Sequence, residues 1–574
     1  MAVNNEAIDF LRDFQKENIK FTNSVEFRDP VTLQVEGKIP EWLNGILYRI
    51  GPGKFNLGDK DGSQHVIHHA FDGLAFVHRF EIKGANSTVQ YNSRMTAEGA
   101  EASTLKNPSQ QIYYGHLPEK QYEPMDAASA AEASRQGTPN VSGVIKDPSS
   151  RNVNVTVTPN YPLPEQFGKD ETDPLVLVSK TDSNRLQCVH SVTLEPKHLF
   201  NYAAYDKRFD GQLSASHHKA DAKTGETFNF TLHLGPESKI TVFSIKKDHS
   251  TTVLADITHR KLPGVPEADQ ERIQPPYIHA FWLTENYVIL PEAPLYLTRG
   301  GMDMLLSKSF VGGMAWRENS PGYLHVVRRD GGGHVVTLPV DPYFIFHTSN
   351  AWDRKLQDGT SVLDLDACAW YNGDIVLQTS QLGLMRKSVP LSPPPASKKI
   401  NGLTVPPASF EFGNLERYHL EFNEQDTSNA KATHHLITRN IEFPRYNPLD
   451  DLKPYKYLWA CQFEQPVSDT DTGRFSLVKV DTETGEKIKL DHERCMYTEP
   501  VFVPRPGAIG RDDGVLLSFT NISQPEKDMD SCALVIVDAK TMAELGRCYI
   551  GQFSCLTFHG SFVSDVHFET STYN

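Results

Sequence analysis

Four histidines carry the most distinctive chemistry of this chain, and each stands among strand-forming residues. His279 lies in YIHAFWLTENYVIL, an aromatic and β-branched run that predicts a buried strand pair with its turn at 284–286. His217, His347 and His559 stand in similar company, in HHKADAKTGE, FHTSNAW and FHGSF. A single buried histidine is most simply a core residue bonded to a carbonyl group, because burying an imidazole without a partner costs about 1–3 kcal/mol. Four of them, dispersed along a β-rich chain, instead predict strands that converge on one metal ion.

The residue types alone do not determine which metal is bound or which of the histidines bind it. Neutral imidazole binds iron, copper, zinc and nickel, and the chain has 22 histidines. His68, His69 and His78 flank Asp72–Gly73, a dipeptide that predicts a tight turn between apolar runs. With the pair at 434–435, these histidines are equally eligible as ligands at this stage.

Composition excludes some classes of protein. The 574 residues are 39% hydrophobic and 10% aromatic, which is enough for a sizeable core, and they carry 57 basic against 72 acidic side chains, a net charge of −15. Nucleic-acid binding is not expected, because it needs clustered Lys and Arg. Seven cysteines without a CxxC motif are typical of reduced core residues. The N-terminus is too charged for a signal peptide, and no run approaches the roughly 18 apolar residues of a membrane span. We therefore expect a cytoplasmic protein, either soluble or bound to a membrane surface.

The pattern along the chain predicts one all-β domain over residues 1–574. Residues 1–30 should form an N-terminal helix, at 5–18, and an arm. Residues 100–150 are rich in Ala, Ser, Gln, Pro and Glu and predict an insertion. From residue 152 onward, repeated hairpins without long helices indicate a closed β array of the propeller type, with no blade count. Residues 291–316 fit either a buried helix or an interfacial, membrane-contacting segment.

An ordered set of motifs identifies a family. The chain resembles the carotenoid cleavage oxygenases, in the branch of the animal β-carotene oxygenases, the retinoid isomerases and their fungal relatives such as the torulene-cleaving enzyme. The resemblance covers most of the chain and rests on LYRIGPG, HHAFDGLAFVHRF, HHKADAKTGE, IHAFWLTENYVIL, FHTSNAWD with DLDAC, IEFPRYN, YTEPVFVPRPG with DDGVLLS, and FHGSF. Seven or eight motifs in the right order are far more specific than a lone pair of histidines.

The resemblance implies a fold and a metal site. The fold is a seven-bladed β-propeller with a cap of loops and short helices, and one Fe²⁺ per chain is held on the axis by His217, His279, His347 and His559. His217 carries a register ambiguity, because the family's HPK reads His217–His218–Lys219 here. The activity implied is cleavage of a carbon–carbon double bond of an apolar polyene with O₂, which gives two carbonyl products.

Carboxylates that accept the other N–H of the ligand histidines are also implied. Glu442 is paired with His347 by resemblance, and Glu499 with His559. For His279 the expected carboxylate position falls on Lys180 in LVSKTD. An ammonium group can only donate, so we expect it to turn away while a water, a carbonyl group, Thr181 or Asp182 takes the role.

The substrate is narrowed only to a class. A carotenoid or apocarotenoid of the torulene or β-carotene class is expected, drawn from a membrane surface by a monotopic protein. The stilbene-cleaving branch has a Lys immediately before its carboxylate, and Ser179 stands there in this register. Stilbene cleavage, retinoid isomerisation and a non-enzymatic propeller scaffold are the alternatives, and the oligomeric state is left open. The side chains beside the ligands that could line a substrate tunnel are Phe71, Tyr277, Phe281, Phe344, Phe346, Phe558 and Lys180.

Overall fold

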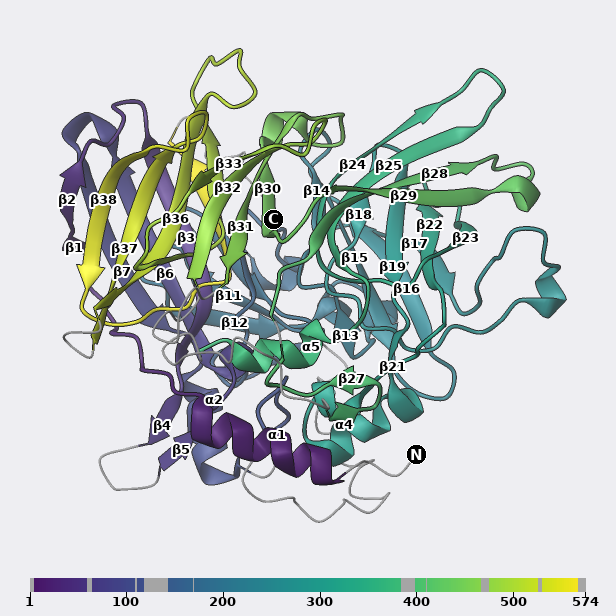
Figure 1. The fold of residues 1–574 in the computed structure, drawn as a ribbon, viewed down its shortest axis with the longest axis horizontal. Coiled ribbons are helices and arrows are strands. Elements are labelled where there is room, and N and C mark those ends of the chain that lie inside the picture. The colour runs from purple at the N-terminus through teal and green to yellow at the C-terminus, as the bar shows by residue number, and fades with distance from the viewer. Residues whose placement is uncertain are drawn as a thin grey trace.

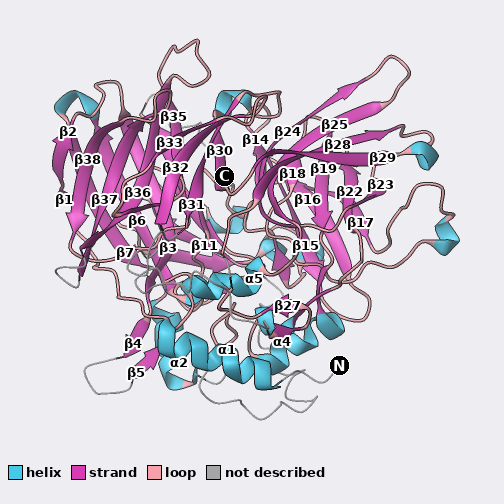
Figure 2. Cartoon of the chain, viewed as in Figure 1, coloured by secondary structure: helices cyan, strands magenta, loops and turns pink. Residues whose placement is uncertain are grey.

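Seven antiparallel sheets are arranged in a ring, which is the seven-bladed β-propeller expected from the sequence (Figures 1 and 2). The computed structural model describes residues 5–58, 64–108, 111–117, 143–168, 170–383, 398–408, 410–465, 474–524 and 529–565. Within these ranges the sheets follow one another in chain order. The exceptions are two strands from the ends of the chain that close the ring.

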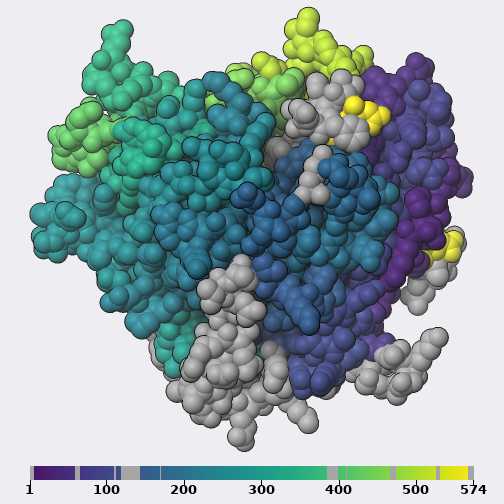
Figure 3. All heavy atoms as spheres, turned by 180° about the vertical axis from the view of Figure 1, so that it is seen from behind, coloured from purple at the N-terminus to yellow at the C-terminus, as the bar shows by residue number. Residues whose placement is uncertain are grey.

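The first three sheets come from the N-terminal half. The first contains β1 (Val31–Thr32), β7 (Thr88–Met95), β6 (Leu74–Lys83), β3 (Asn44–Lys54) and β39 (His559–Ser564). The second contains β8 (Val144–Ile145), β12 (Pro196–Phe200), β11 (Leu186–His190), β10 (Val176–Lys180) and β9 (Thr156–Pro159). The third contains β13 (Leu213–Ser214), β15 (Glu226–His233), β16 (Lys239–Ile245) and β17 (Thr251–Ile257), with β14 (Lys219–Asp221) beside β15. Seen from behind, the second and third sheets, in blue, form the middle of the molecule (Figure 3).

The other four sheets complete the ring. The fourth contains β18 (Trp282–Leu283), β19 (Tyr287–Glu292), β22 (Gly322–Arg328) and β23 (His334–Val340). The fifth contains β24 (Phe344–Lys355), β25 (Ser361–Trp370), β28 (Asn414–Phe422) and β29 (Lys431–Thr438). The sixth contains β30 (Glu442–Tyr446), β31 (Tyr457–Glu464), β32 (Arg474–Asp481) and β33 (Lys487–Leu490). The seventh contains β2 (Gln34–Gly37), β38 (Glu544–Gly551), β37 (Met529–Asp538), β36 (Gly514–Gln524) and β34 (Cys495–Tyr497), with β35 (Val501–Pro504) beside β36.

The two ends of the chain close the ring. The C-terminal strand β39 pairs with β3 in the first sheet, and the N-terminal strand β2 pairs with β38 in the seventh. Strands such as β16 and β19 are buried along nearly their whole length, because each sheet packs between two neighbouring sheets. This explains why many strands read as continuous apolar runs instead of alternating.

Helices gather on one side of the ring, below the sheets in Figure 1. They are α1 (Asn5–Asn18), α2 (Glu98–Lys106), α4 (Met302–Ser307) and α5 (Ile375–Gln378). In α1, Ile8 and Leu11 are buried and Phe14 packs against the same core, as the spacing of these residues predicts. Of the expected insertion at 100–150, residues 109–110 and 118–142 lie outside the described part of the chain.

Two local predictions need correction. The Asp72–Gly73 dipeptide is not a hairpin turn. It ends a short 3₁₀ helix, η1 (Ala70–Asp72), where the buried Asp72 carboxylate accepts the backbone N–H groups of residues 114–116. Residues 291–316 are not one buried helix, since they hold β20 (Leu295–Leu297), α4 and β21 (Met314–Trp316).

All seven cysteines are free and buried, in agreement with their expected role as reduced core residues. Within the described part of the chain, no helix is both long enough and apolar enough to cross a membrane.

Candidate metal centre

Four histidines from four different sheets meet at the centre of the ring. His217, His279, His347 and His559 offer ring nitrogens that all lie within 4.8 Å of one another. Their side chains belong to residues that are only 5, 6, 9 and 2% exposed, respectively. The structure therefore brings together the four histidines that the resemblance singles out. His68, His69, His78 and the pair at 434–435 are not among them.

The four histidines stand at or near strand ends, or at a shift in strand register, and these positions let their side chains point toward the centre of the ring. His559 is the first residue of β39, opposite Ile50 of β3. His217 and His279 precede short strands, and a backbone bridge joins His217 to Ala280. His347 sits where the β24–β25 register shifts, which is a bulge of the kind that turns a side chain out of the ladder.

Ring contacts distinguish His217 from His218. Its ring lies 4.4–4.9 Å, between centroids, from those of the other three histidines. The ring of His218 points elsewhere and lies edge-on against Tyr161, 5.0 Å away.

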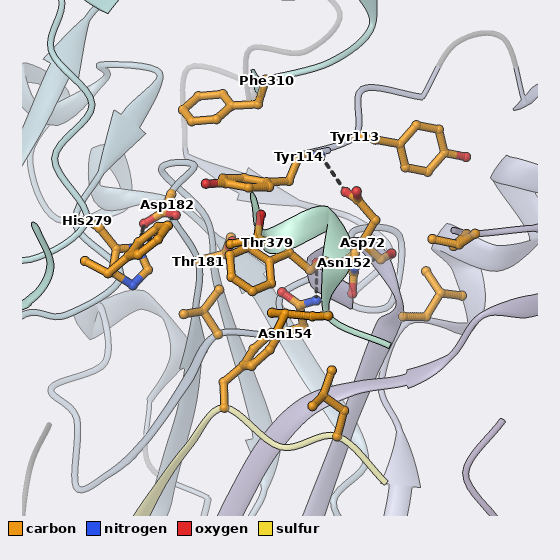
Figure 4. A pocket seen from close by; sticks show the side chains of 18 of the residues that line it. Asp72, Tyr113, Tyr114, Asn152, Asn154, Thr181, Asp182, His279, Phe310 and Thr379 are labelled. Carbon is orange, nitrogen blue, oxygen red and sulfur yellow. Dashed lines mark hydrogen bonds and ion pairs between the residues drawn. The ribbon is translucent and has the colours of Figure 1, made fainter. Parts of the chain in front are cut away.

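Three of the four histidines are held by carboxylates through Nδ1. Glu442 faces His347, and Glu499 faces His559 at 3.0 Å, which are the two pairings that the resemblance implies. His279 Nδ1 lies 2.8 Å from Oδ1 of Asp182, which also accepts hydrogen bonds from the hydroxyl groups of Tyr277 and Ser216. Figure 4 shows Asp182 beside His279 at the wall of a pocket.

Placing Lys180 in the carboxylate position was wrong by two residues. Asp182, one of the acceptors left open by the sequence, makes the contact, while Lys180 turns away as expected. Its ammonium group donates to Thr158 at 2.7 Å and lies 5.3 Å from the ring centre of Tyr161. In the corrected register the residue before the carboxylate is Thr181 instead of Ser179.

Two arginines that the sequence argument did not single out hold Glu499. The fully buried Arg49 lies 3.4 Å from Oε2 and also donates to the Glu499 carbonyl group, and Arg445 lies 3.4 Å from Oε1. Burial alone would raise the pKa of Glu499, but the charges of Arg445 and Arg49 and the hydrogen bond with His559 outweigh burial and lower this pKa to about 2. Arg49 stands in LYRIGPG, so the motif itself contained the signal.

Phe443 is a third residue near the site that was not predicted from the sequence. Its backbone is left-handed, with φ of 58°, which is a strained conformation for a residue with a large side chain. Its ring lies 5.1 Å from that of His347 and 5.6 Å from that of His559. The strain lies between Glu442 and the next strand residues, where the β30–β31 register also shifts.

The donor set fits a divalent metal ion. The Nε2 atoms of His347 and His559 face each other at 3.2 Å while both Nδ1 atoms are engaged by carboxylates. Two nitrogens that bind one ion at about 2.1 Å and at a right angle lie about 3 Å apart. His217 Nε2 is buried and has no hydrogen-bond partner within the described residues. Burial lowers the pKa of His559 to about 3 and that of His217 well below its ordinary value, so both rings stay neutral and keep a lone pair for a metal.

Each of the seven sheets supplies one residue to this centre. In sheet order, these are His559, Asp182, His217, His279, His347, Glu442 and Glu499. The site therefore depends on the whole ring, not on one local motif.

A cavity of about 810 Å³ opens onto the metal centre, and His279, His347 and His559 form part of its wall. Of the aromatic residues expected in a tunnel, Phe71, Phe346 and Phe558 line it. The others are not among the lining residues. Phe281 is fully buried beside Phe230, Phe344 packs on Tyr277 and Trp370, Tyr277 supports His279 from behind, and Lys180 is buried in the second sheet.

Comparison with known proteins agrees with this geometry. Residues 20–564 match the retinal pigment epithelial membrane protein family. A carotenoid dioxygenase of Neurospora crassa is 28% identical, with 95% of this chain and 90% of the relative covered. A torulene dioxygenase of Fusarium fujikuroi is 29% identical, with 94 and 92% covered.

Solved structures show the same fold. A cobalt-substituted Synechocystis apocarotenoid oxygenase superposes with a TM-score of 0.65 at 19% identity, covering 97% of this chain and 99% of that one. The ring of seven sheets, the convergence of the histidines and the match over 20–564 lead to one conclusion. The chain belongs to the retinal pigment epithelial membrane protein family, in which its relatives are carotenoid dioxygenases.

Proposed function

We propose that this protein is an iron-dependent dioxygenase that cleaves one double bond of a carotenoid or apocarotenoid. The observation that carries this proposal is the cluster of four buried histidines, three of which line a large cavity with aromatic side chains in its wall. Both oxygen atoms of O₂ end in the products, one in each of the two carbonyl groups. His217, His279, His347 and His559 would hold Fe²⁺, which supplies the activation of O₂ when it is bound.

The residues of the chain have separate tasks in this proposal. Asp182, Glu442 and Glu499 each accept an Nδ1–H, which fixes the histidine tautomer and leaves Nε2 free to bind. Phe71, Phe346 and Phe558 supply apolar walls that exclude water and align a polyene beside the centre.

The substrate is proposed from the relatives, whose names specify torulene and carotene. Stilbene cleavage is the second candidate, and Thr181 in place of a lysine before Asp182 disfavours it. If none of the three substrates in the test below is cleaved, bound iron would leave retinoid isomerisation as the alternative and an absence of iron would leave a non-enzymatic scaffold.

The test uses freshly purified protein loaded with iron in air. Torulene, β-carotene and resveratrol are incubated with it separately, and the products are separated by chromatography. We expect one iron per chain and two carbonyl products from a carotenoid. Cleavage of resveratrol alone would show that the protein is a stilbene-cleaving oxygenase. An absence of both iron and cleavage would mean that it is a non-enzymatic scaffold.

His217 and His218 provide a matched pair of variants for this test. Both are buried neighbours, but only His217 belongs to the cluster. His217→Ala should lose iron and cleavage, whereas His218→Ala should keep iron. The opposite result would contradict the proposed ligand set.

We further propose that the protein works at the cytoplasmic surface of a membrane, from which it takes its apolar substrate. Helix α4 supports this proposal, because Met302, Met304 and Leu305 line the cavity while Met302 is also 37% exposed. Phe310, which follows α4 in the segment 291–316, is buried against Tyr114 and Tyr277 and does not contribute to this surface.

A further inference from the structure

The cavity is not apolar throughout. Besides its aromatic wall it has a polar part, formed where the turn between β10 and β11 meets neighbouring loops. The residues of this part include Arg151, Asn152, Asn154, Asn184, Arg185 and Asn201. A hydrocarbon offers no partner to the charged groups among them.

The neutral side chains of the polar part are already used by the fold. Asn184 donates to the carbonyl groups of Phe209 and Gly211, and Asn154 donates to those of Phe71 and Gly73. These amides brace loops and are not free to recognise a ligand.

The two arginines differ from these amides. Within the described residues the Arg185 side chain has no hydrogen bond and no ion pair, and that of Arg151 has only a hydrogen bond to the Ser150 carbonyl group, at 3.0 Å. Desolvation by burial, with the nearby charge of Arg151, lowers the pKa of Arg185 to about 10, so it remains a cation at neutral pH. Both arginines are only partly exposed, and a charge that is partly withdrawn from water is stabilised by a partner of opposite charge.

The carboxylates nearest in sequence have other partners. Asp182 is engaged by His279, Tyr277 and Ser216. Asp210, which also lines the cavity, is 63% exposed and lies 3.3 Å from His233. The anion that would balance Arg185 is therefore not among the described residues of the wall.

Arg185 also lies near Asp182, the carboxylate that holds His279. It ends the turn that contains Asp182, and three peptide units separate the two residues. Their Cα atoms are thus no more than about 11 Å apart. A ligand that touches the aromatic wall beside His279 and extends to Arg185 must be apolar along most of its length and charged at one end.

We propose that the cavity accepts a polyene that ends in a carboxylate, an apocarotenoic acid, and that Arg185, with Arg151 beside it, holds this end group. This inference rests on the proposed cleavage activity and narrows its substrate class. A carboxylate is favoured because a guanidinium binds it through two parallel N–H donors. An aldehyde or hydroxyl end could accept a hydrogen bond but would not balance the charge.

The test compares one apocarotenoic acid with its methyl ester and with the aldehyde of the same polyene. Binding to the iron-loaded protein is measured without O₂, by quenching of tryptophan fluorescence, and kcat/KM is then measured in air. The unmodified protein should bind the acid at least about tenfold more tightly than the ester, as expected for a charge-assisted hydrogen bond. Arg185→Met should weaken acid binding by about ten- to a hundredfold and reduce the preference for acid over ester.

Two further variants make this result specific. Arg185→Lys should recover part of the preference, because it restores the charge but not the paired donors. Arg208→Met is the matched control, since Arg208 is 61% exposed and pairs with Asp206. It should change neither affinity.

Equal affinity of the unmodified protein for acid and ester would overturn the inference. The inference would also be overturned if Arg185→Met and Arg185→Lys lost affinity equally for the acid and for the ester. Selective acid binding without cleavage of any polyene would refute the proposed function and leave the carboxylate site standing. Cleavage of polyenes without discrimination between acid and ester would support the proposed function and refute the carboxylate site.

Discussion

At the scale of single residues, the acceptor of His279 is the most informative position. The Asp182 side chain is one methylene shorter than those of Glu442 and Glu499, each of which holds one other histidine. Its carboxylate nevertheless lies 2.8 Å from Nδ1 of His279. We expect Asp182→Ala to lower iron affinity by about ten- to a hundredfold, because the ring loses the group that orients it. Metal analysis after dialysis against a graded chelator measures this change.

Ser183→Ala, on the same turn, is the control and should keep iron. If Asp182→Ala and Ser183→Ala bind iron equally well, the Asp182 contact does not support the metal site.

The buried Lys180 side chain should make the stability of the protein depend on pH. Burial lowers the pKa of this side chain from 10.5 to about 7. Between these pH values the unfolded chain binds a proton that the folded chain lacks, so this residue makes the protein less stable as pH falls from about 10 to 7. Lys180→Met removes the effect and should stabilise the protein at pH 7 by about 2 kcal/mol more than at pH 9.

Urea denaturation of both proteins at the two pH values measures this difference. Lys223→Met, which removes an 84% exposed lysine, should show no such dependence. An identical stability change at both pH values for Lys180→Met would mean that its ammonium group stays charged in the fold.

At the scale of elements, helix α4 carries the membrane proposal. On this helix Met302 is 37% exposed and Leu306 is partly exposed. Because each buried large apolar side chain contributes about 1.5–3 kcal/mol, Met302→Glu with Leu306→Glu should weaken binding to liposomes at least about a hundredfold. Flotation of the protein with liposomes measures the loss.

Ile509→Glu is the control for this variant, because Ile509 is 97% exposed and lies between β35 and β36. It should float as the unmodified protein does. Undiminished flotation of the α4 variant would assign membrane contact to another surface.

The elements were also the level at which sequence reasoning worked best. Repeated hairpins and the helix at 5–18 can be read from periodicity, since strand and helix patterns are local. Whether a side chain points into the cavity cannot be predicted from such local patterns. Phe281 and Phe346 both stand near a histidine of the cluster in the sequence, but Phe281 is fully buried in the core whereas Phe346 lines the cavity. Asp182 was misplaced for a similar reason, because nothing in LVSKTD marks where strand β10 ends.

At the scale of the whole molecule, the candidate metal centre draws residues from every sheet of the ring. All seven sheets send one residue to it, so an ion bound there should resist separation of any two sheets. Free iron at 100 times its Kd would stabilise the fold by about 2.7 kcal/mol. Removing iron with a chelator should therefore lower the melting temperature.

The His347→Ala variant distinguishes this effect from a direct action of the chelator. It cannot complete the site, so the chelator should leave its melting temperature unchanged. If the unmodified iron-loaded protein also shows no shift, bound iron does not stabilise the ring.

The closure of the ring by both chain ends has a consequence for biosynthesis. Strands β2 and β3 are made early, but their partners β38 and β39 lie about 500 residues later. Because His559 opens β39, the last piece of the ring to leave the ribosome also carries the last of the four clustered histidines. Until then the nascent chain exposes unpaired strand edges in its first sheet, the kind of surface on which chains aggregate. Any product of early termination would lack ring closure and the fourth histidine together, so partial chains cannot assemble the complete centre.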